Sequence, residues 1–446
     1  MFHKVFIYHR HLDLMPKDAK GGDFVEITKL DGAIRGTLMP SHSKDTIVVK
    51  LSSGYNLAIR KGKIKKITLL KKLSKPKKER IGIKHKKGLK TVTILHTGGT
   101  IASEVDYETG AVTPQFSPEE ITSMFPELEN LVNVKSRLIS NMFSEDMNFS
   151  HYNNIAQEIE REVKGKVDGI IISHGTDTLH YTSAALAFIL EDLDIPVILV
   201  GAQRSSDRAS TDAKINLICA AKFIAKTDFS EVAICMHENM EDETCLILPA
   251  CKTRKLHSSR RDAFKPINTK PWARVYFNED KIDVVDNRFR KKENRKLKLN
   301  LFNEKLKIGL LKSHPNMIAD EIKRYERFDG LVLEGYGIAG NFPINETDEF
   351  TKENTKIYNE LKKLANKIPV IASSQTIFGK INMNVYSTGR KLQEIGIIGG
   401  LSDMTAETAF IKLAWLLSNH PKQVKELFMH NLRGELSLRL SDTAFI

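Results

Sequence analysis

The pattern of hydrophobic and polar residues changes about ninety residues into the chain. Before that point, short runs alternate apolar and polar side chains and are separated by turn residues. Alternation with a period of two is typical of strands that bury one face, so this part predicts a small all-β domain. The predicted strands lie within residues 23–32, 33–42, 46–54, 55–62 and 63–70. We expect a small β-barrel over residues 1–75, followed by a basic linker over 76–90.

From residue 91 the apolar runs become continuous and alternate with stretches of helical periodicity. Strands buried on both faces and separated by helices indicate an α/β fold with parallel sheets. The expected strands of a first unit lie at 91–96, 167–173, 195–202 and 231–236, and its helices at 179–193 and 212–226. The same order resumes in a smaller unit, with strands at 307–313, 329–335 and 368–374 and helices at 318–328, 355–367 and 407–419. The sequence therefore predicts a large α/β domain over 91–287, a second basic linker over 288–304 and a small α/β domain over 305–446.

Composition narrows the class of protein without identifying it. A chain of 446 residues with 41% hydrophobic and 28% charged residues has ample material for globular domains, which excludes disordered and collagen-like proteins. The longest apolar run, residues 184–190, is too short to span a bilayer, and the N-terminus lacks the apolar core of a signal peptide. We expect a cytoplasmic protein that does not contact the membrane. The four cysteines form no CxxC pair, which predicts buried thiols and no structural zinc.

The net charge of +13 comes almost entirely from one segment. Residues 60–90 contain fifteen Lys and Arg against the single acid Glu79, so the rest of the chain is close to neutral. A smaller cluster, residues 288–298, has seven basic residues against Glu293. Like charges cannot be buried together, so we expect both segments to be exposed. They are either solvated linkers or surfaces for the phosphate backbone of a nucleic acid, and charge alone does not decide between the two.

Two polar loops follow predicted strands directly, at the ends where open α/β sheets bind their ligands. The first is His96-Thr97-Gly98-Gly99-Thr100-Ile101-Ala102, and the second is Ser173-His174-Gly175-Thr176-Asp177-Thr178. A threonine follows glycine in each loop, so the backbone can approach a substrate closely. Hydroxyls are weak nucleophiles, and Asp177 with a lysine from elsewhere could activate one of them.

Other interpretations of these loops carry weight. Threonine and aspartate after a strand are also common helix N-caps, and Gly-Gly is a common turn, so either loop alone has a structural explanation. The histidines have no acidic or histidine neighbour at a metal-ligand spacing, so no metal site is predicted. The first loop lacks the G-x-G-x-x-G spacing of a dinucleotide site.

Together, and in this order, TGGTIAS and HGTDT resemble the two signature motifs of the asparaginase family. The resemblance implies an asparaginase-like body of a large and a small α/β domain. It identifies Thr100 as the nucleophile, with Thr176, Asp177 and Lys255 forming a Thr-Lys-Asp triad. Lys252, in the same basic stretch, is the competing lysine. The roles of Thr100 and Thr176 could also be exchanged.

The same resemblance implies a set of substrate-binding residues. Tyr107 matches the tyrosine of a mobile loop that closes over the substrate. Ser144 and Glu145 in MFSEDM match the pair that holds the amino-acid moiety. Asn341 in GYGIAGNFP matches a substrate asparagine of the small domain, with a longer spacing.

A β domain and basic linker ahead of this body resemble the D-type subunit of the archaeal glutamyl-tRNA(Gln) amidotransferases. That resemblance implies a glutaminase subunit of a glutaminyl-tRNA synthase (glutamine-hydrolysing), a ligase. No cofactor is implied for this chain, because an E-type partner subunit uses ATP and Mg²⁺ to convert Glu-tRNA(Gln) to Gln-tRNA(Gln). It also implies a homodimer within a heterotetramer, with Glu-tRNA(Gln) bound mainly by the partner. The alternatives are a stand-alone L-asparaginase with an accessory domain, and a nucleic-acid-binding module on an inactive scaffold.

Overall fold

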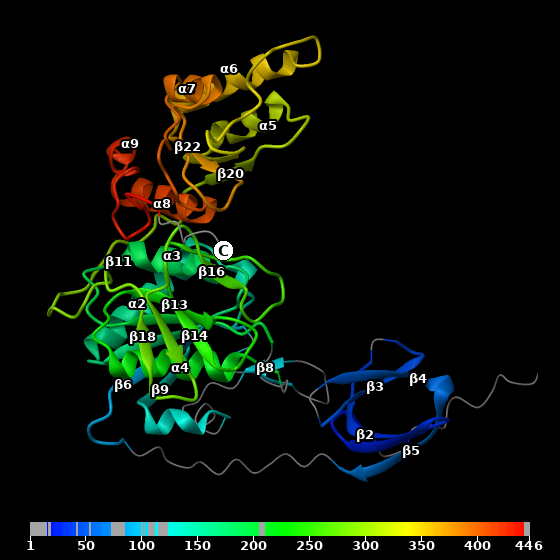
Figure 1. Cartoon of the computed structure of the whole chain (residues 1–446). Coiled ribbons are helices and arrows are strands. Elements are labelled where there is room, and N and C mark those ends of the chain that lie inside the picture. Colours follow the sequence, from blue (N-terminus) through cyan, green and yellow to red (C-terminus); the bar gives the residue numbers. More distant parts are fainter. Residues whose placement is uncertain are drawn as a thin grey trace, which may run out of the picture.

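In the computed structural model, the chain forms an N-terminal β domain, a large α/β domain and a small α/β domain (Figure 1). The structure describes residue 16 and residues 19–41, 43–52, 55–72, 85–99, 101, 103–105, 112–114, 124–204 and 210–440. Two predicted site residues, Thr100 and Tyr107, lie outside the described residues.

The N-terminal domain is one antiparallel sheet of five strands in the order β4-β3-β2-β1-β5. The strands are Phe24–Lys29 (β1), Gly32–Met39 (β2), Thr46–Lys50 (β3), Asn56–Arg60 (β4) and Ile64–Lys71 (β5), with the 3-10 turn Lys61–Lys63 (η1) between the last two. The inward face buries Val25, Ile27, Val49 and Ile67. Two irregularities in the β1–β5 register add the bend that such bulges produce. The predicted small β domain is therefore confirmed.

The large domain is built on an eight-stranded sheet in the order β18-β17-β14-β13-β12-β10-β6-β9. The strands are Thr91–His96 (β6), Asn133–Leu138 (β9), Gly169–Ser173 (β10), Val197–Val200 (β12), Val232–His237 (β13), Thr244–Pro249 (β14), Ala273–Tyr276 (β17) and Ile282–Val284 (β18). The five strands from β13 to β9 are parallel, as predicted. The other three continue the sheet antiparallel, and the hydrophobic pattern did not indicate them.

Helices cover both faces of this sheet, because its central strands are apolar on both sides. In β10, Ile170 and Ile172 pack in the same cluster as helices Phe149–Lys164 (α2) and Leu179–Ile189 (α3). The residue between them, Ile171, packs in the cluster of helix Ala213–Lys226 (α4) on the opposite face. Helix α3 ends earlier than predicted, because Leu190 and Glu191 leave it to pair with Leu299 and Lys298.

The small domain has a three-stranded parallel sheet in the order β20-β21-β22, as predicted. Its elements are Ile308–Lys312 (β20), Ala319–Lys323 (α5), Arg324–Arg327 (η4), Gly330–Gly335 (β21), Lys352–Lys367 (α6), Val370–Ser374 (β22), Ser387–Glu394 (α7), Ala406–Asn419 (α8) and Val424–Leu427 (α9). Helix α8 lies between the two domains (Figure 1), and its Trp415 packs against Phe188 of α3. The predicted order of a large and then a small α/β domain is confirmed.

Shorter elements complete the body. They are Ser103–Val105 (β7), Val112–Pro114 (β8), Pro126–Asn130 (η2), Ser144–Asp146 (η3), Leu190–Glu191 (β11), Thr253–Lys255 (β15), Phe264–Pro266 (β16) and Lys298–Leu299 (β19). All four cysteines are buried free thiols, as expected. Within the described residues, no helix has the length and apolar character needed to cross a membrane.

Candidate active site

The candidate site lies where the chain reverses its direction of travel across the large sheet. From β6 the chain moves to β9 on one side, and it then returns to form β10 on the other side of β6. Loops that diverge at such a switch point leave a crevice at the carboxyl ends of the strands, where α/β proteins bind ligands. The loops that follow β6 and β10 are the two that contain the predicted motifs.

The backbones of these two loops are in direct contact. The amide and the hydroxyl of Thr97 both donate to the carbonyl of Ser173, at 3.1 and 3.0 Å. Gly99 has a φ of +81°, and a Cβ at this position would lie 2.8 Å from the amide nitrogen of Gly175. Only glycine fits this conformation and this contact. The chain therefore enters position 100 from a turn held against the Gly175-Thr176 loop.

A third loop, which contains Ser144 and Glu145, closes one side of the site. Ser144 is buried, and its carbonyl accepts a hydrogen bond from the Thr178 hydroxyl at 2.6 Å. A Cβ at Gly175 would lie 2.9 Å from the Ser144 Oγ, so the two loops touch here as well. Glu145 is exposed beside it. The structure thus brings Ser144 to the HGTDT loop, although about thirty residues separate them in sequence.

Lys255 joins Thr176 and Asp177 in one cluster. Its Nζ donates to the Thr176 Oγ1 at 2.9 Å and to the Asp177 Oδ1 at 2.8 Å. The Lys255 side chain is 10% exposed, whereas that of Asp177 is 66% exposed, so the ammonium is held inside the crevice by a carboxylate at its mouth. Lys255 ends β15 and lies opposite the buried Phe264 of β16, which fixes the strand that carries it.

The competing lysine and the candidate asparagine lie elsewhere. Lys252 is buried in an ion pair with Asp403, away from Thr176. Asn341 follows β21 in the small domain, where its backbone pairs with Tyr336 and its Oδ1 is buried without a partner. Within the described part of the chain, no hydrogen bond joins Asn341 to the Lys255 cluster.

Sequence reasoning missed a supporting layer behind Thr176. The Gln203 Oε1 accepts from the Thr176 hydroxyl at 3.5 Å. The buried carboxylate of Asp212 accepts from the amides of Gln203 and Arg204, both at 3.0 Å, and from the Asn216 side chain at 3.2 Å. Gln203 follows β12 at the same sheet edge as the two motifs, so the rule that found those loops would have found it too.

The two loop histidines are structural and uncharged near neutral pH. His96 is buried between the hydroxyls of Ser173 and Ser136, and burial lowers its pKa to about 3. His174 contacts the Gly175 carbonyl at 2.6 Å and the Thr182 hydroxyl at 2.8 Å, and burial lowers its pKa to about 4. Among the residues that the structure describes, no group of three His, Cys, Asp or Glu side chains could hold a metal.

Family models match three parts of the chain. Residues 19–70 match the GatD N-terminal domain, residues 91–290 match the asparaginase N-terminal family, and residues 307–428 match the glutaminase/asparaginase C-terminal domain. These ranges coincide with the β domain and the two α/β domains. The crevice therefore lies in the part of the chain that is similar to asparaginases.

Curated relatives match almost the whole chain. The D-type subunit of the Pyrococcus furiosus glutamyl-tRNA(Gln) amidotransferase is 39% identical over 97% of this chain and 98% of its own length. The Methanococcus maripaludis protein of the same name is 40% identical over 93% of this chain and 98% of its own. Among solved structures, the L-asparaginase of Thermococcus kodakarensis has a TM-score of 0.65 and 28% identity, covering 78% of this chain and 99% of its own. L-asparaginase I of Vibrio cholerae has a TM-score of 0.66 and 28% identity, covering 78% of this chain and 100% of its own.

Proposed function

Because the chain belongs to the family of D-type glutamyl-tRNA(Gln) amidotransferase subunits, whose body is an asparaginase fold, we propose that it is the glutaminase subunit of a tRNA-dependent amidotransferase. It hydrolyses glutamine to glutamate and ammonia. A second subunit uses the ammonia with ATP and Mg²⁺ to convert Glu-tRNA(Gln) to Gln-tRNA(Gln). The observation that carries the proposal is the near-complete match to the D-type relatives, with the Lys255 cluster at the switch point of the asparaginase-like domain.

The chemistry needs a nucleophile, a path for a proton and a site for the oxyanion. Thr100 attacks the carboxamide carbon of glutamine; the C–N bond breaks, ammonia leaves and a γ-glutamyl ester remains. Water then hydrolyses the ester, which releases glutamate and restores the hydroxyl. Backbone amides around Gly98 and Gly99 hold the developing oxyanion, an interaction that contributes about 3–4 kcal/mol in other enzymes. The position of Gly99 against Gly175 supports this assignment, because it directs the start of the Thr100 segment to the Thr176 loop.

Lys255 positions Thr176 and relays its proton. Its Nζ contacts the Thr176 hydroxyl and the Asp177 carboxylate at once, so the carboxylate fixes the direction in which the ammonium donates. In this assignment Thr176 exchanges a proton with the leaving amine or the attacking water. The rival assignment makes Thr176 the nucleophile, and the exposed Asp177 fits a group that substrate closes off from water.

Substrate recognition falls to the surrounding loops. Ser144 and Glu145 hold the amino-acid end of glutamine, which is consistent with the packing of Ser144 on Gly175. Tyr107 lies between β7 and β8, which pair antiparallel, so its segment leaves the body and returns to it. Such a loop is suited to close over a bound substrate. Asn341 of the small domain completes the set.

The proposal includes a partner and an assembly. The chain forms a homodimer, and two E-type partner subunits complete a heterotetramer in the cytoplasm. The partner makes most contacts to Glu-tRNA(Gln) and binds ATP and Mg²⁺, so this chain needs no cofactor. The family name implies a partner subunit, and the arrangement of four chains is the finer part of the proposal.

A stand-alone L-asparaginase is the second candidate. The solved asparaginases resemble the body of this chain and cover 78% of it. They leave the N-terminal β domain unexplained, whereas the D-type relatives cover it. The asparaginase likeness therefore supports the hydrolytic chemistry rather than a free-standing role.

The test is ammonia release by the purified chain from glutamine and from asparagine, with and without an E-type partner subunit and Glu-tRNA(Gln). Glutamine hydrolysis that rises on addition of the partner and Glu-tRNA(Gln) is the expected result. Rapid asparagine hydrolysis that is indifferent to both would contradict the proposal. Thr100→Val and Thr176→Val, examined for a trapped γ-glutamyl ester on the remaining hydroxyl, assign the nucleophile.

A further inference from the structure

The two basic segments of the chain differ in their ionic partners. In residues 288–298 the cations are paired with acids, most of them on the large domain. The pairs are Arg288–Asp286, Arg290–Asp192, Lys291–Asp228, Arg295–Asp194 and Lys298–Asp192. Phe289 of the same segment is buried. This segment is therefore a strap whose charge is largely neutralised by the protein itself.

The basic residues of the N-terminal domain have no such compensation. Residues 19–72 contain twelve Lys and Arg and only four Asp and Glu. Glu26 is paired with Arg35 and Asp31 with Lys29. Five exposed cations have no ion-pair partner within the described residues, and they are Arg60, Lys65, Lys66, Lys71 and Lys72. The excess charge of the chain is thus presented to solvent here.

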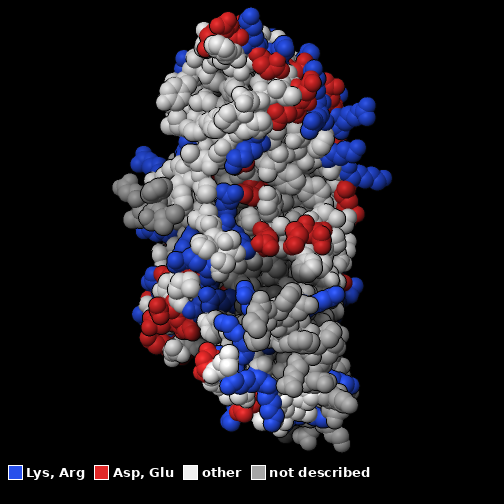
Figure 2. Space-filling view, turned by 90° about the vertical axis from the view of Figure 1, so that its right-hand side faces the viewer, with Lys and Arg blue, Asp and Glu red and all other residues white. Residues whose placement is uncertain are grey.

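These cations share a local architecture. Arg60 ends β4, η1 follows at once, and Lys65, Lys66 and Lys71 belong to β5. Strands β4 and β5 are the two end strands of the sheet, so both lie at its edge. At the other end of β4, Tyr55 is 62% exposed. Figure 2 shows Lys and Arg side chains along the lower part of the face turned to the viewer, the part in which this domain lies.

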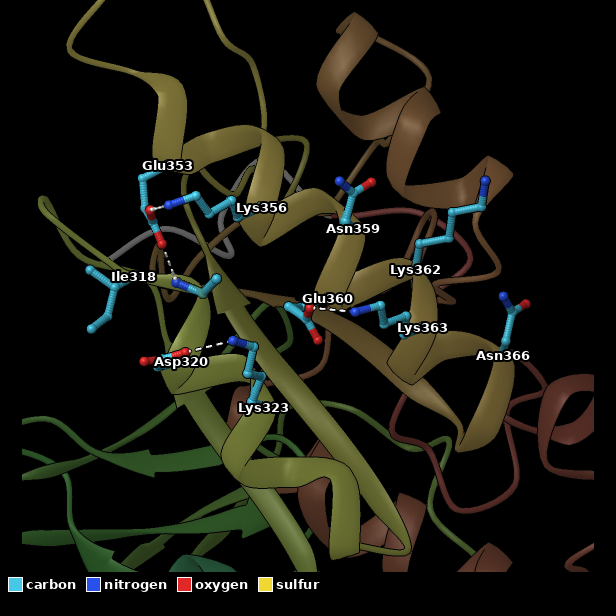
Figure 3. Close-up of a pocket in the computed structure, with 11 residues that line it drawn as sticks. Ile318, Asp320, Lys323, Glu353, Lys356, Asn359, Glu360, Lys362, Lys363 and Asn366 are labelled. Atoms are coloured by element: carbon cyan, nitrogen blue, oxygen red, sulfur yellow. Dashed lines mark hydrogen bonds and ion pairs between the residues drawn. The ribbon is translucent and has the colours of Figure 1, made fainter.

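A lysine-rich surface on the small domain is a useful contrast. A hollow of about 750 Å³ between α5 and α6 is lined by four lysines. Three of them pair with carboxylates on their own helix, Lys323 with Asp320, Lys356 with Glu353 and Lys363 with Glu360 (Figure 3). Its positive charge is mostly cancelled, so this hollow has no strong preference for a polyanion. Lysine content alone therefore does not distinguish the N-terminal surface; the absence of counter-charges does.

We propose that β4, η1 and β5 of the N-terminal domain bind the phosphate backbone of RNA. Unpaired lysines spread along neighbouring strands match a chain of phosphates, since each contact releases a condensed counterion. Tyr55 adds an exposed ring on which an unpaired base can stack. The choice of tRNA as the RNA rests on the proposed function, whereas the charge argument does not. This surface gives the chain a direct hold on the tRNA in addition to the partner's.

The test is a titration of fluorescein-labelled tRNA transcript with the full-length chain, followed by anisotropy between about 50 and 250 mM KCl. The test variant is Lys65→Glu/Lys66→Glu, and Lys65→Gln/Lys66→Gln is a milder version. The control, Lys362→Glu/Lys363→Glu, makes the same change in net charge on α6 of the small domain. We expect about tenfold weaker binding for the Glu variant. Because each phosphate contact contributes a slope of about 0.7 to 0.9 in log Kd against log salt, two lost contacts should flatten the slope by about 1.5.

The outcomes separate this proposal from the proposed function. Control binding within twofold of wild type, with a normal unfolding temperature for each variant, supports a local RNA surface. Equal weakening by both Glu variants means that only net charge matters and overturns it. Binding of the chain to phosphatidylserine vesicles but not to tRNA also overturns it. Glutaminase activity is measured separately and should be unchanged in the Lys65/Lys66 variants, so tRNA binding by a chain without glutaminase activity would count against the proposed function alone.

Discussion

Lys252 and Asp403 form a buried ion pair, although they lie 151 positions apart in the sequence. Their side chains are 3% and 0% exposed. Asp403 precedes α8 and also accepts a hydrogen bond from the amide of Ser437, at 3.0 Å, so the pair ties the large domain to α8 and to the C-terminal segment. Lys255, three residues further on, contacts Thr176 instead. The two neighbouring lysines therefore have separate roles, one in joining domains and one in the crevice.

Removing one partner of this pair should destabilise the fold strongly. In Asp403→Asn the Lys252 ammonium stays buried without a counter-charge, and such losses typically lower the free energy of unfolding by about 3–5 kcal/mol. Urea denaturation measures the change. Lys252→Met/Asp403→Leu should recover much of the loss, and Asp320→Asn, which breaks an exposed pair, should change stability by less than about 1 kcal/mol. A similar effect of Asp403→Asn and Asp320→Asn would contradict this account.

Lys255→Met should abolish most glutaminase activity while leaving the fold intact. The variant removes the donor to Thr176, and loss of one such positioned group commonly lowers kcat by about 10²–10³. Ammonia release under saturating glutamine measures it. Arg254→Gln is the matched control, because Arg254 lies on the same short strand but pairs with Glu407, at 2.8 Å. A control that loses as much activity as Lys255→Met would show that the strand matters, and not the ammonium.

Gly99→Ala should impair catalysis through the contact between the two motif loops. The new methyl group would lie 2.8 Å from the Gly175 amide nitrogen, so one of the loops must move. We expect kcat to fall at least about tenfold, since a displacement near 1 Å can cost 10²-fold. Gly379→Ala is the control: it also has a positive φ, +101°, but its methyl group would meet no atom within 4 Å. Equal kcat values for the two variants would show that backbone strain, and not loop contact, sets the requirement.

Asp212→Asn should lower kcat more than it raises KM. Asp212 acts as a positioning residue, because its carboxylate holds the amides of Gln203 and Arg204 and so sets the Gln203 side chain beside Thr176. An amide group in its place turns an N–H group toward an N–H donor. We expect about a tenfold lower kcat with KM within about twofold, measured by steady-state ammonia release. Asp228→Asn, at an exposed site, should leave both constants unchanged.

Acid should destabilise the large domain below about pH 6.5. His96 and His174 have pKa values of about 3 and about 4 in the folded chain because both are buried, against 6.5 for an unperturbed histidine. The unfolded chain therefore takes up protons that the folded chain does not. The stability is fully present above pH 6.5 and falls as the pH drops toward 4, by up to about 1.4 kcal/mol per pH unit for each histidine. Urea denaturation at pH 7.5, 6.0 and 5.0 measures the slope, and His174→Gln should reduce it.

Much of the architecture was accessible from the sequence because it depends on local pattern. Period-two alternation in the N-terminal part and continuous apolar runs such as Ile170–Ile172 follow from burial on one face or on two. Strands β14, β17 and β18 escaped notice because nothing local distinguishes an antiparallel strand at the end of a large sheet. The end of α3 was also misplaced, because Leu190 leaves the helix to pair with Leu299, a residue more than a hundred positions away.

The sequence by itself determined the family of motifs, the three-part order of the chain and the location of its excess charge, because spacing, periodicity and composition are properties of the chain alone. Only the tertiary structure decided which lysine lies beside Thr176, since Lys252 and Lys255 differ in the direction of their side chains within one hairpin region. It also revealed Asp212 behind the loops and separated the neutralised basic strap from the unpaired cations of β5. The physical reason is the same in each case: charge pairing and hydrogen bonding depend on distances of about 3 Å between residues that the fold, and not the sequence, makes neighbours.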